Sequence, residues 1–192
     1  MKCLRQDFCV QIRDASTTLA EHLKFIDEFG AHLGMTRLFG RAAPGERVVE
    51  ATAGYSGTHY TVVATLGLQG ITAPWVFEGA MNGIAFETYV EQLLAPTLRP
   101  GDLVVIDNLS SHKSEPISRL IAARGARVHF LPPYSPDLNP IELCWAKVKT
   151  ALRAAKARTF DALVDALCDA LRAINPADVI AWFAHCGYAV NP

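Results

Sequence analysis

The stretch GDLVVIDN, residues 101–108, contains the residues that decide the fold. Its centre, Leu103 to Ile106, is a short and uninterrupted apolar run, which is typical of a strand buried on both faces of a parallel sheet. Asp107 follows directly, so a carboxylate stands at the carboxyl end of this strand. Ligands of open α/β sheets bind at that edge, although an aspartate in this position also commonly caps the next turn.

The sequence on both sides of this strand alternates between strand and helix patterns. Strands are predicted where β-branched and aromatic residues cluster, and helices where apolar residues recur every three or four positions. The further predicted strands lie at 22–32, at 126–132 and, as an antiparallel hairpin turning at 68–70, within 60–79. The predicted helices lie at 83–95, about 114–123, from 140 onward and about 159–174. This order predicts an α/β domain with a mixed sheet.

Composition narrows the class of protein. A chain of 192 residues is long enough for one domain with a substantial core. Its net charge of −1 gives no overall signature of a nucleic-acid binder, so any such role must come from a local patch. The five cysteines are scattered without a C-x-x-C pair, which argues against a zinc site or a disulfide framework. No apolar run approaches the roughly 18 residues of a membrane helix, and we expect a cytoplasmic protein.

Two further acidic residues stand at unusual places. Asp27 lies inside the hydrophobic strand 22–32, where an unpaired charge is costly. Glu142 follows the proline-rich block LPPYSPDLNP, which stiffens the backbone that enters a helix. Asn139, Pro140 and Glu142 occupy the N-cap, first and third positions of that helix, so a capping box is one explanation of the glutamate. A rigidly held metal ligand is the other, and the two are compatible.

Three blocks of the sequence resemble the acidic blocks of mariner-like DNA transposases. They are FIDEFG at 25–30, VVIDNLSSHKS at 104–114 and LPPYSPDLNPIELCWAKVK at 131–149. The spacing of 34 residues between Asp107 and Glu142 is similar to that of the 630 family of bacterial insertion sequences. The similarity extends from about residue 20 to the HCGY motif near the C-terminus.

This resemblance implies a ribonuclease H-like fold, as in retroviral integrases, with a five-stranded mixed sheet flanked by helices. It also implies that Asp27, Asp107 and Glu142 are the catalytic, metal-binding triad. Accessory positions of the same blocks are Glu28, Asn108, His112 and Asn139.

The triad has a physical reason. Two unit charges 4 Å apart repel by about 4 kcal/mol at an effective dielectric constant near 20, so converging carboxylates need cations between them. Oxygen ligands without histidine or cysteine favour Mg²⁺ or Mn²⁺. Two such ions support in-line displacement at phosphorus, which is the chemistry of phosphodiester cleavage and of joining a 3′-hydroxyl end to target DNA.

A local basic patch accompanies the triad. Five basic residues and no acid occur between Lys147 and Arg158. A solvated helix face would explain them, but beside a phosphodiester site they are equally suited to contact phosphates. The residues predicted to bind DNA are Lys113, Lys147, Lys149, Arg153 and Lys156.

The predicted organisation is a lead-in at 1–21 followed by a transposase catalytic domain at 22–192, without the N-terminal helix-turn-helix region that the family resemblance implies. We expect DNA as the partner, a homodimer in the active complex, and room for a separately encoded helix-turn-helix partner. Two other functions fit the same residues. One is a catalytically silent remnant that binds DNA or dimerises as an inhibitor, and the other is a general ribonuclease H-like nuclease.

Overall fold

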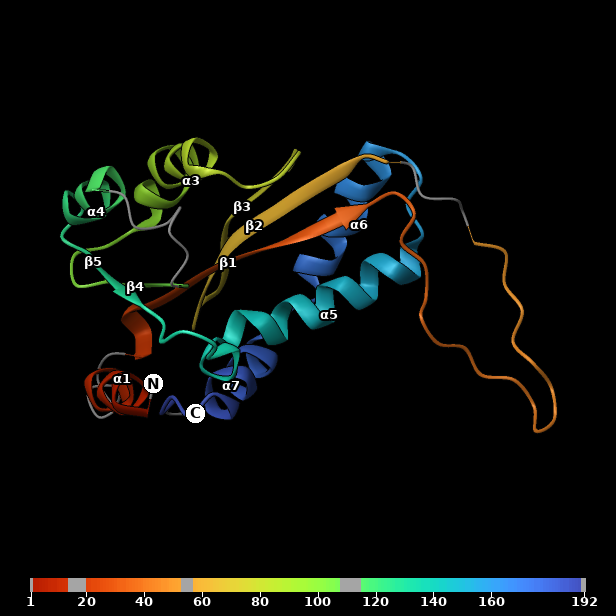
Figure 1. Ribbon diagram of the computed structural model, residues 1–192, viewed down its shortest axis with the longest axis horizontal. Helices are drawn as coiled ribbons and strands as arrows, with labels where there is room; N and C mark the ends of the chain where they lie inside the picture. Colours follow the sequence, from red (N-terminus) through yellow and green to blue (C-terminus); the bar gives the residue numbers. More distant parts are fainter. Residues whose placement is uncertain (1, 14–19, 53–56, 108–114, 191–192) are drawn as a thin grey trace.

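A computed structural model describes residues 2–13, 20–52, 57–107 and 115–190. Its centre is one five-stranded sheet in the order β3-β2-β1-β4-β5 (Figure 1). The strands are β1 Leu23–His32, β2 His59–Gly67, β3 Gly70–Glu78, β4 Leu103–Ile106 and β5 Arg127–Phe130. β1, β2 and β3 pair antiparallel, whereas β1, β4 and β5 run parallel. The predicted mixed α/β sheet and its hairpin are therefore confirmed.

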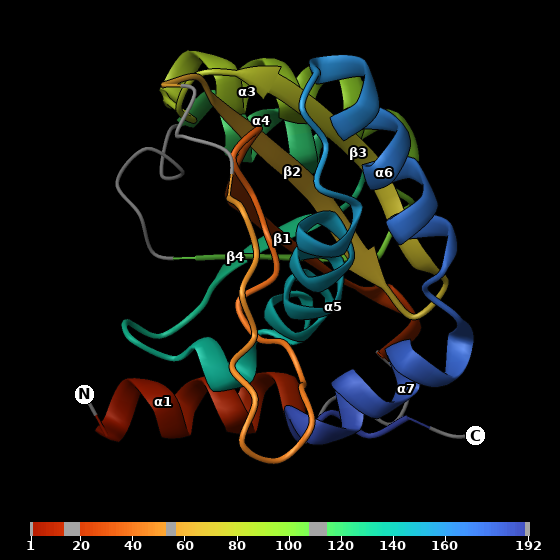
Figure 2. The ribbon, with the colours of Figure 1, turned by 90° about the vertical axis from the view of Figure 1, so that its right-hand side faces the viewer.

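Helices cover both faces of the sheet (Figures 1 and 2). α3 Gly83–Tyr89, continued by a π-helical turn at Val90–Leu94, and α4 Glu115–Ala122 pack on one face. α5 Pro140–Ala155, α6 Phe160–Arg172 and α7 Pro176–His185 pack on the other. No helix in the described part of the chain is long and apolar enough to cross a membrane.

The core explains why α5 lies where it does. Ile141, Trp145, Val148 and Leu152 recur at helical spacing and are all essentially buried. The Trp145 ring lies 4.9 Å from the ring of Phe29 on β1, centroid to centroid. Alternate residues of β1 thus face α5, and this alternation determines which side of the sheet receives Asp27.

The N-terminal segment joins the same core. α1, Lys2–Phe8, is followed by a π-helical turn at Cys9–Arg13. Phe8 and Ile12 are buried, and the Phe8 ring lies 5.4 Å from the ring of His129 on β5, centroid to centroid. Residues 14–19 of the predicted lead-in lie outside the described residues.

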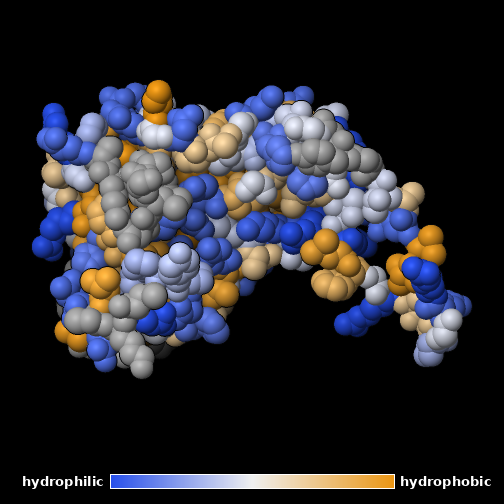
Figure 3. Space-filling view, in the orientation of Figure 1, coloured by the Kyte–Doolittle hydropathy of each residue, from blue (hydrophilic) through white to orange (hydrophobic). Residues whose placement is uncertain are grey.

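The connection between β1 and β2 extends away from the sheet as an arm (Figure 1). Leu38, Phe39 and Val49 on it are exposed, and Figure 3 shows apolar side chains along its surface. Arg158 anchors its base, because the guanidinium donates hydrogen bonds to the carbonyls of Leu33 at 2.7 Å and Met35 at 3.1 Å.

The predicted capping box at the start of α5 is wrong. Asn139 is the N-cap residue and Pro140 occupies the first turn, but the Asn139 side chain makes no capping hydrogen bond. The backbone N–H of Glu142 instead donates to the Asn139 carbonyl at 3.1 Å. The backbone of Asn139 is extended, with φ −112° and ψ 94°, and its side chain accepts no hydrogen bond from the first turn of the helix. A complete capping box forms instead at α7, between Asn175 and Asp178.

Candidate active site

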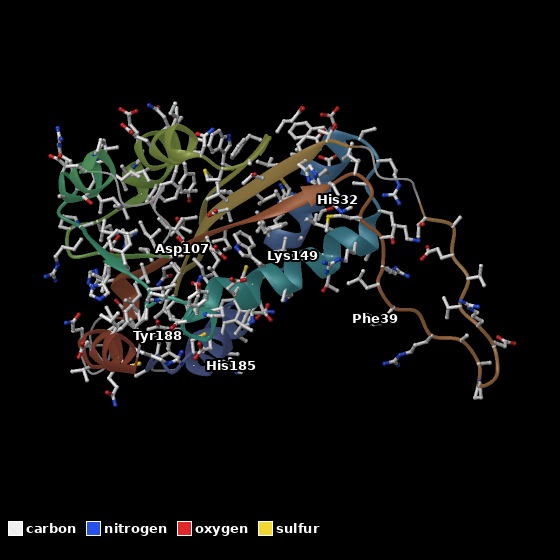
Figure 4. All side chains as sticks on the ribbon, in the orientation of Figure 1. His32, Phe39, Asp107, Lys149, His185 and Tyr188 are labelled. Atoms are coloured by element: carbon white, nitrogen blue, oxygen red, sulfur yellow. The ribbon has the colours of Figure 1, made fainter. Side chains whose placement is uncertain are left out.

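Parallel pairing of β1 with β4 brings Asp27 and Asp107 to matching positions of neighbouring strands. Phe25 pairs with Val105, so Asp27 and Asp107 each lie two residues further along their chains. Phe25 and Val105 both belong to the core that α5 covers. Because side chains two residues apart share a face of a strand, Asp27 lies on the side of the sheet that α5 covers, and Asp107 follows the end of β4 on the same side. Figure 4 labels Asp107 beside β1.

The proline-rich loop delivers the third acid. After β5, the N–H of Leu131 donates to the Ile106 carbonyl at 2.8 Å, which fixes the start of the loop at the end of β4. Residues 136–138 form a short 3₁₀ turn, and α5 begins at Pro140 with Glu142 in its first turn. Asp27, Asp107 and Glu142 line one cavity of about 410 Å³, together with Leu131, Pro132, Pro133, Tyr134, Ser135, Pro136 and Asn139.

The electrostatics of this cavity follow from its three acids. The pKa of the Asp27 carboxyl is raised to about 8, most of all by burial and then by the negative charges of Glu142, Glu28 and Asp107. A single backbone hydrogen bond at Glu28 works in the opposite direction. An acid in this environment holds its proton near neutral pH unless a cation compensates its charge.

The donor set fits a hard divalent cation, since among the described residues every titratable side chain that lines the cavity, apart from the phenol of Tyr134, is a carboxylate. Within the described residues, no three histidine, cysteine or acidic side chains already form a group that could hold a metal ion. The cavity therefore gathers oxygen donors and negative charge without a closed set of ligands.

The predicted accessory residues differ in position. Glu28 follows Asp27 on β1, is half-buried, and contributes to the raised pKa of its neighbour. Asn139 lines the cavity and is only 4% exposed, and its Oδ1 has no hydrogen-bond partner among the described residues. Asn108, His112 and the predicted DNA contact Lys113 lie outside the described residues.

Two of the predicted DNA-binding residues are engaged in ion pairs. The Lys147 ammonium lies 2.5 Å from an Asp178 carboxylate oxygen and donates to the Ala173 carbonyl at 3.2 Å, which ties α5 to α7. Lys156 forms an ion pair with Glu50 of the arm. Both lysines therefore already have anionic partners within the chain.

Lys149 and Arg153 lie differently. They line a groove of about 390 Å³ together with Gly30 and His32 of β1 and with residues of the arm. The Lys149 ammonium stands 5.1 Å from the centroid of the Phe29 ring, a cation–π contact that leaves its charge available to other partners. Figure 4 labels Lys149 on α5 and His32 near the end of β1.

Two residues near the site were not predicted from the sequence. His32 lines the groove beside Lys149 and Arg153, and its position at the end of the strand 22–32 was the available signal. Tyr134 lines the acidic cavity although the residue is 91% exposed. The signal in the sequence for Tyr134 was an aromatic residue inside a proline-rich loop.

Comparison with known protein families agrees with the resemblance found in the sequence. The sequence model described as "DDE superfamily endonuclease" matches residues 22–164. No curated protein sequence matches the chain.

Among solved structures, the chain is similar to the Mos1 strand transfer complex, with a TM-score of 0.75, 15% identity, and coverage of 95% of this chain and 57% of that chain. The Mos1 mariner paired-end complex with Mn gives a TM-score of 0.75, 15% identity, and coverage of 96% and 58%. The Mos1 transposase catalytic domain with Raltegravir and Mg gives 0.69, 14%, and coverage of 97% and 85%. At this identity the likeness establishes the fold, which is the predicted ribonuclease H-like one. The chain spans a little over half the length of the first two structures.

Proposed function

We propose that this chain, which belongs to the DDE superfamily of endonucleases, is the catalytic domain of a mariner-like transposase that cleaves phosphodiester bonds at element ends and joins the resulting 3′-hydroxyl ends to target DNA. The observation that carries the proposal is the meeting of Asp27, Asp107 and Glu142, from three distant parts of the sequence, around one cavity. The raised pKa of Asp27 supports it, since the three negative charges influence one another.

Mg²⁺ or Mn²⁺, as a pair of ions, is the proposed cofactor, with Asp27, Asp107 and Glu142 as its ligands. When bound, such ions activate an attacking water or 3′-hydroxyl and stabilise the leaving oxygen at phosphorus. The chain's own contribution is to position its carboxylates on a rigid frame. β1 and β4 fix two of them through strand pairing, and the proline-rich loop fixes the third through the start of α5.

DNA is the proposed partner, and its backbone would follow the groove lined by Lys149 and Arg153, which lie on the same helix as Glu142. Lys149, Arg153 and His32 line this groove, and cationic side chains there would hold phosphates without reading bases. Lys147 and Lys156 are given no direct role, because their charges are already compensated by Asp178 and Glu50. Two copies of the chain would act together on paired ends, and sequence-specific recognition of the ends would need a helix-turn-helix unit in addition.

Strand cleavage tests the proposal most directly. Supercoiled plasmid is incubated with the full chain and Mg²⁺ or Mn²⁺, and nicked product is measured on a gel beside an EDTA control. We expect metal-dependent nicking that Asp107→Asn abolishes while the melting temperature stays near that of the wild type. No nicking with either metal would favour a silent remnant, and nicking without any joining of 3′-hydroxyl ends to a target duplex would favour a general nuclease.

A further inference from the structure

Tyr134 combines two features that the fold itself does not require. The residue is 91% exposed, more than any other large hydrophobic residue in the described part of the chain. Its backbone has φ +55°, in the left-handed region that bulky residues rarely adopt and that glycine or asparagine occupies with less strain. The ring therefore contributes little burial to the stability of the fold, and the left-handed backbone of Tyr134 lowers that stability. Strain of this kind is characteristic of functional positions.

The loop around Tyr134 is held firmly. Pro133 precedes it and Pro136 follows, which restricts the backbone on both sides. Ser135 and Asn139 are buried, and the N–H of Asn139 donates to the Pro136 carbonyl at 2.9 Å. An exposed side chain on such a loop is presented in a defined place, so a partner that binds it loses little conformational freedom.

Two supports reach the loop from distant parts of the chain. Arg5 of α1 pairs with Asp137 and donates to the Ser135 hydroxyl at 3.4 Å. The Tyr188 hydroxyl donates to the Leu138 carbonyl at 2.7 Å, and both residues are buried. The exposure of Tyr134 thus belongs to a fixed loop, and the ring stands at the rim of the cavity that Asp27, Asp107 and Glu142 line.

We propose that Tyr134 is a base-stacking residue that receives an unpaired nucleobase next to the phosphate held in the acidic cavity. The proposal rests on the proposed function, because it places DNA in that cavity. A free aromatic face attracts any base whose own face is uncovered, whatever its sequence. Bases inside a duplex are covered by their neighbours, so the partner is a base that is single-stranded or unstacked beside the cleaved bond. The stacked base would fix the register of the strand relative to the three carboxylates.

The test uses the full chain and a DNA duplex with a short single-stranded 3′ extension whose first unpaired base is 2-aminopurine. Binding is measured with Ca²⁺ in place of Mg²⁺, and stacking is read as quenching of the 2-aminopurine fluorescence. We expect quenching with the wild type, Tyr134→Phe and Tyr134→Trp, and none with Tyr134→Ala. The Kd of Tyr134→Ala should rise by about 5- to 140-fold, which corresponds to the loss of one stacked base.

A fully paired duplex with blunt ends is the matched control probe, and all of these proteins should bind it alike. Tyr134→Asn is the second variant, since asparagine accepts the left-handed backbone and keeps the loop folded without a large ring. It should behave as Tyr134→Ala does. Quenching and affinity that persist in Tyr134→Ala would overturn the proposal, and so would a loss of binding in Tyr134→Phe equal to that in Tyr134→Ala.

Plasmid nicking by the wild type separates this proposal from the one it rests on. If the wild type nicks plasmid and Tyr134→Ala still quenches the probe, the stacking proposal alone is wrong. If the wild type nicks nothing with Mg²⁺ or Mn²⁺, the proposed function fails, whichever way the fluorescence behaves.

Discussion

Replacing Asp27 with asparagine should stabilise the metal-free protein, and the stabilisation should grow with pH. The pKa of Asp27 is raised from 3.8 to about 8 by burial and by the neighbouring acids. Since the folded-state pKa lies above the unfolded one, this group favours folding most strongly below about pH 4. That contribution is lost progressively as the pH rises through about 8. The asparagine side chain of the variant carries no charge at any pH, so the variant does not suffer this loss.

The magnitude follows from the two pKa values. The proton that the Asp27 carboxyl takes up on folding would oppose folding by at most about 1.6 kcal/mol at pH 5 and about 4 kcal/mol at pH 7. Asp27 is only half-buried by exposed area, and water at the cavity screens its charge. We therefore expect Asp27→Asn to raise the free energy of unfolding by roughly 1–2 kcal/mol at pH 7 and by clearly less at pH 5.

Urea unfolding in EDTA at several pH values between 5 and 8 measures this difference. Asp165→Asn on the exposed face of α6 is the matched control, and it should change the free energy of unfolding by less than about 0.5 kcal/mol at every pH. Mg²⁺ should stabilise the wild type more than Asp27→Asn, because the variant lacks one anionic ligand. A variant that is less stable than the wild type in EDTA, or a difference that does not change with pH, would refute the reasoning.

Substitutions at four other residues give further testable outcomes. Glu142→Gln and Glu142→Ala should both abolish plasmid nicking. Both should leave the free energy of unfolding within about 0.5 kcal/mol of the wild type, because the exposed glutamate forms no capping box. Nicking by either variant would show that Glu142 is not part of the active site. Lys149→Gln should weaken DNA binding and lower the slope of log Kd against log salt concentration by about 1. Lys147→Gln should leave that slope unchanged and lower the free energy of unfolding by up to about 1 kcal/mol. Equal slopes for the two variants in a salt titration would contradict this distinction. Tyr188→Phe should cost about 1–2 kcal/mol in urea unfolding, because a buried carbonyl loses its donor; an unchanged midpoint would show that water replaces the hydroxyl.

The elements that depend on local patterns could be predicted from the sequence. The apolar run from Leu103 to Ile106 and the alternation around Asp27 depend only on neighbours in the chain, and both became the expected strands. The stripe that includes Trp145 likewise specified the buried face of α5. Convergence of Asp107 with Asp27 was predicted through the family resemblance, since the order of elements alone allows several sheet topologies.

The features that depend on distant partners could not be predicted. Lys147 was predicted to bind DNA, and that prediction is untested; its ion pair with Asp178 of α7 comes from packing that nothing near Lys147 in the sequence indicates. The spacing of Asn139 and Glu142 matches a capping box, yet the backbone that the loop imposes on Asn139 keeps its side chain away from the helix. A spacing motif indicates which groups could bond, whereas the backbone angles decide which of them do.

The two supports of the proline-rich loop lie outside the part of the chain that the family's sequence model matches. Arg5 precedes residue 22 and Tyr188 follows residue 164. A fragment trimmed to 22–164 would therefore keep every acidic residue of the cavity and lose both anchors of the loop that delivers Glu142. Conversely, a protein module joined ahead of α1 would be linked to the acidic cavity through Arg5, which pairs with Asp137, and through Phe8, which packs against His129 of β5. A force or a rotation applied at that end of the chain would reach the loop that delivers Glu142 directly through Arg5, besides acting on the sheet through Phe8.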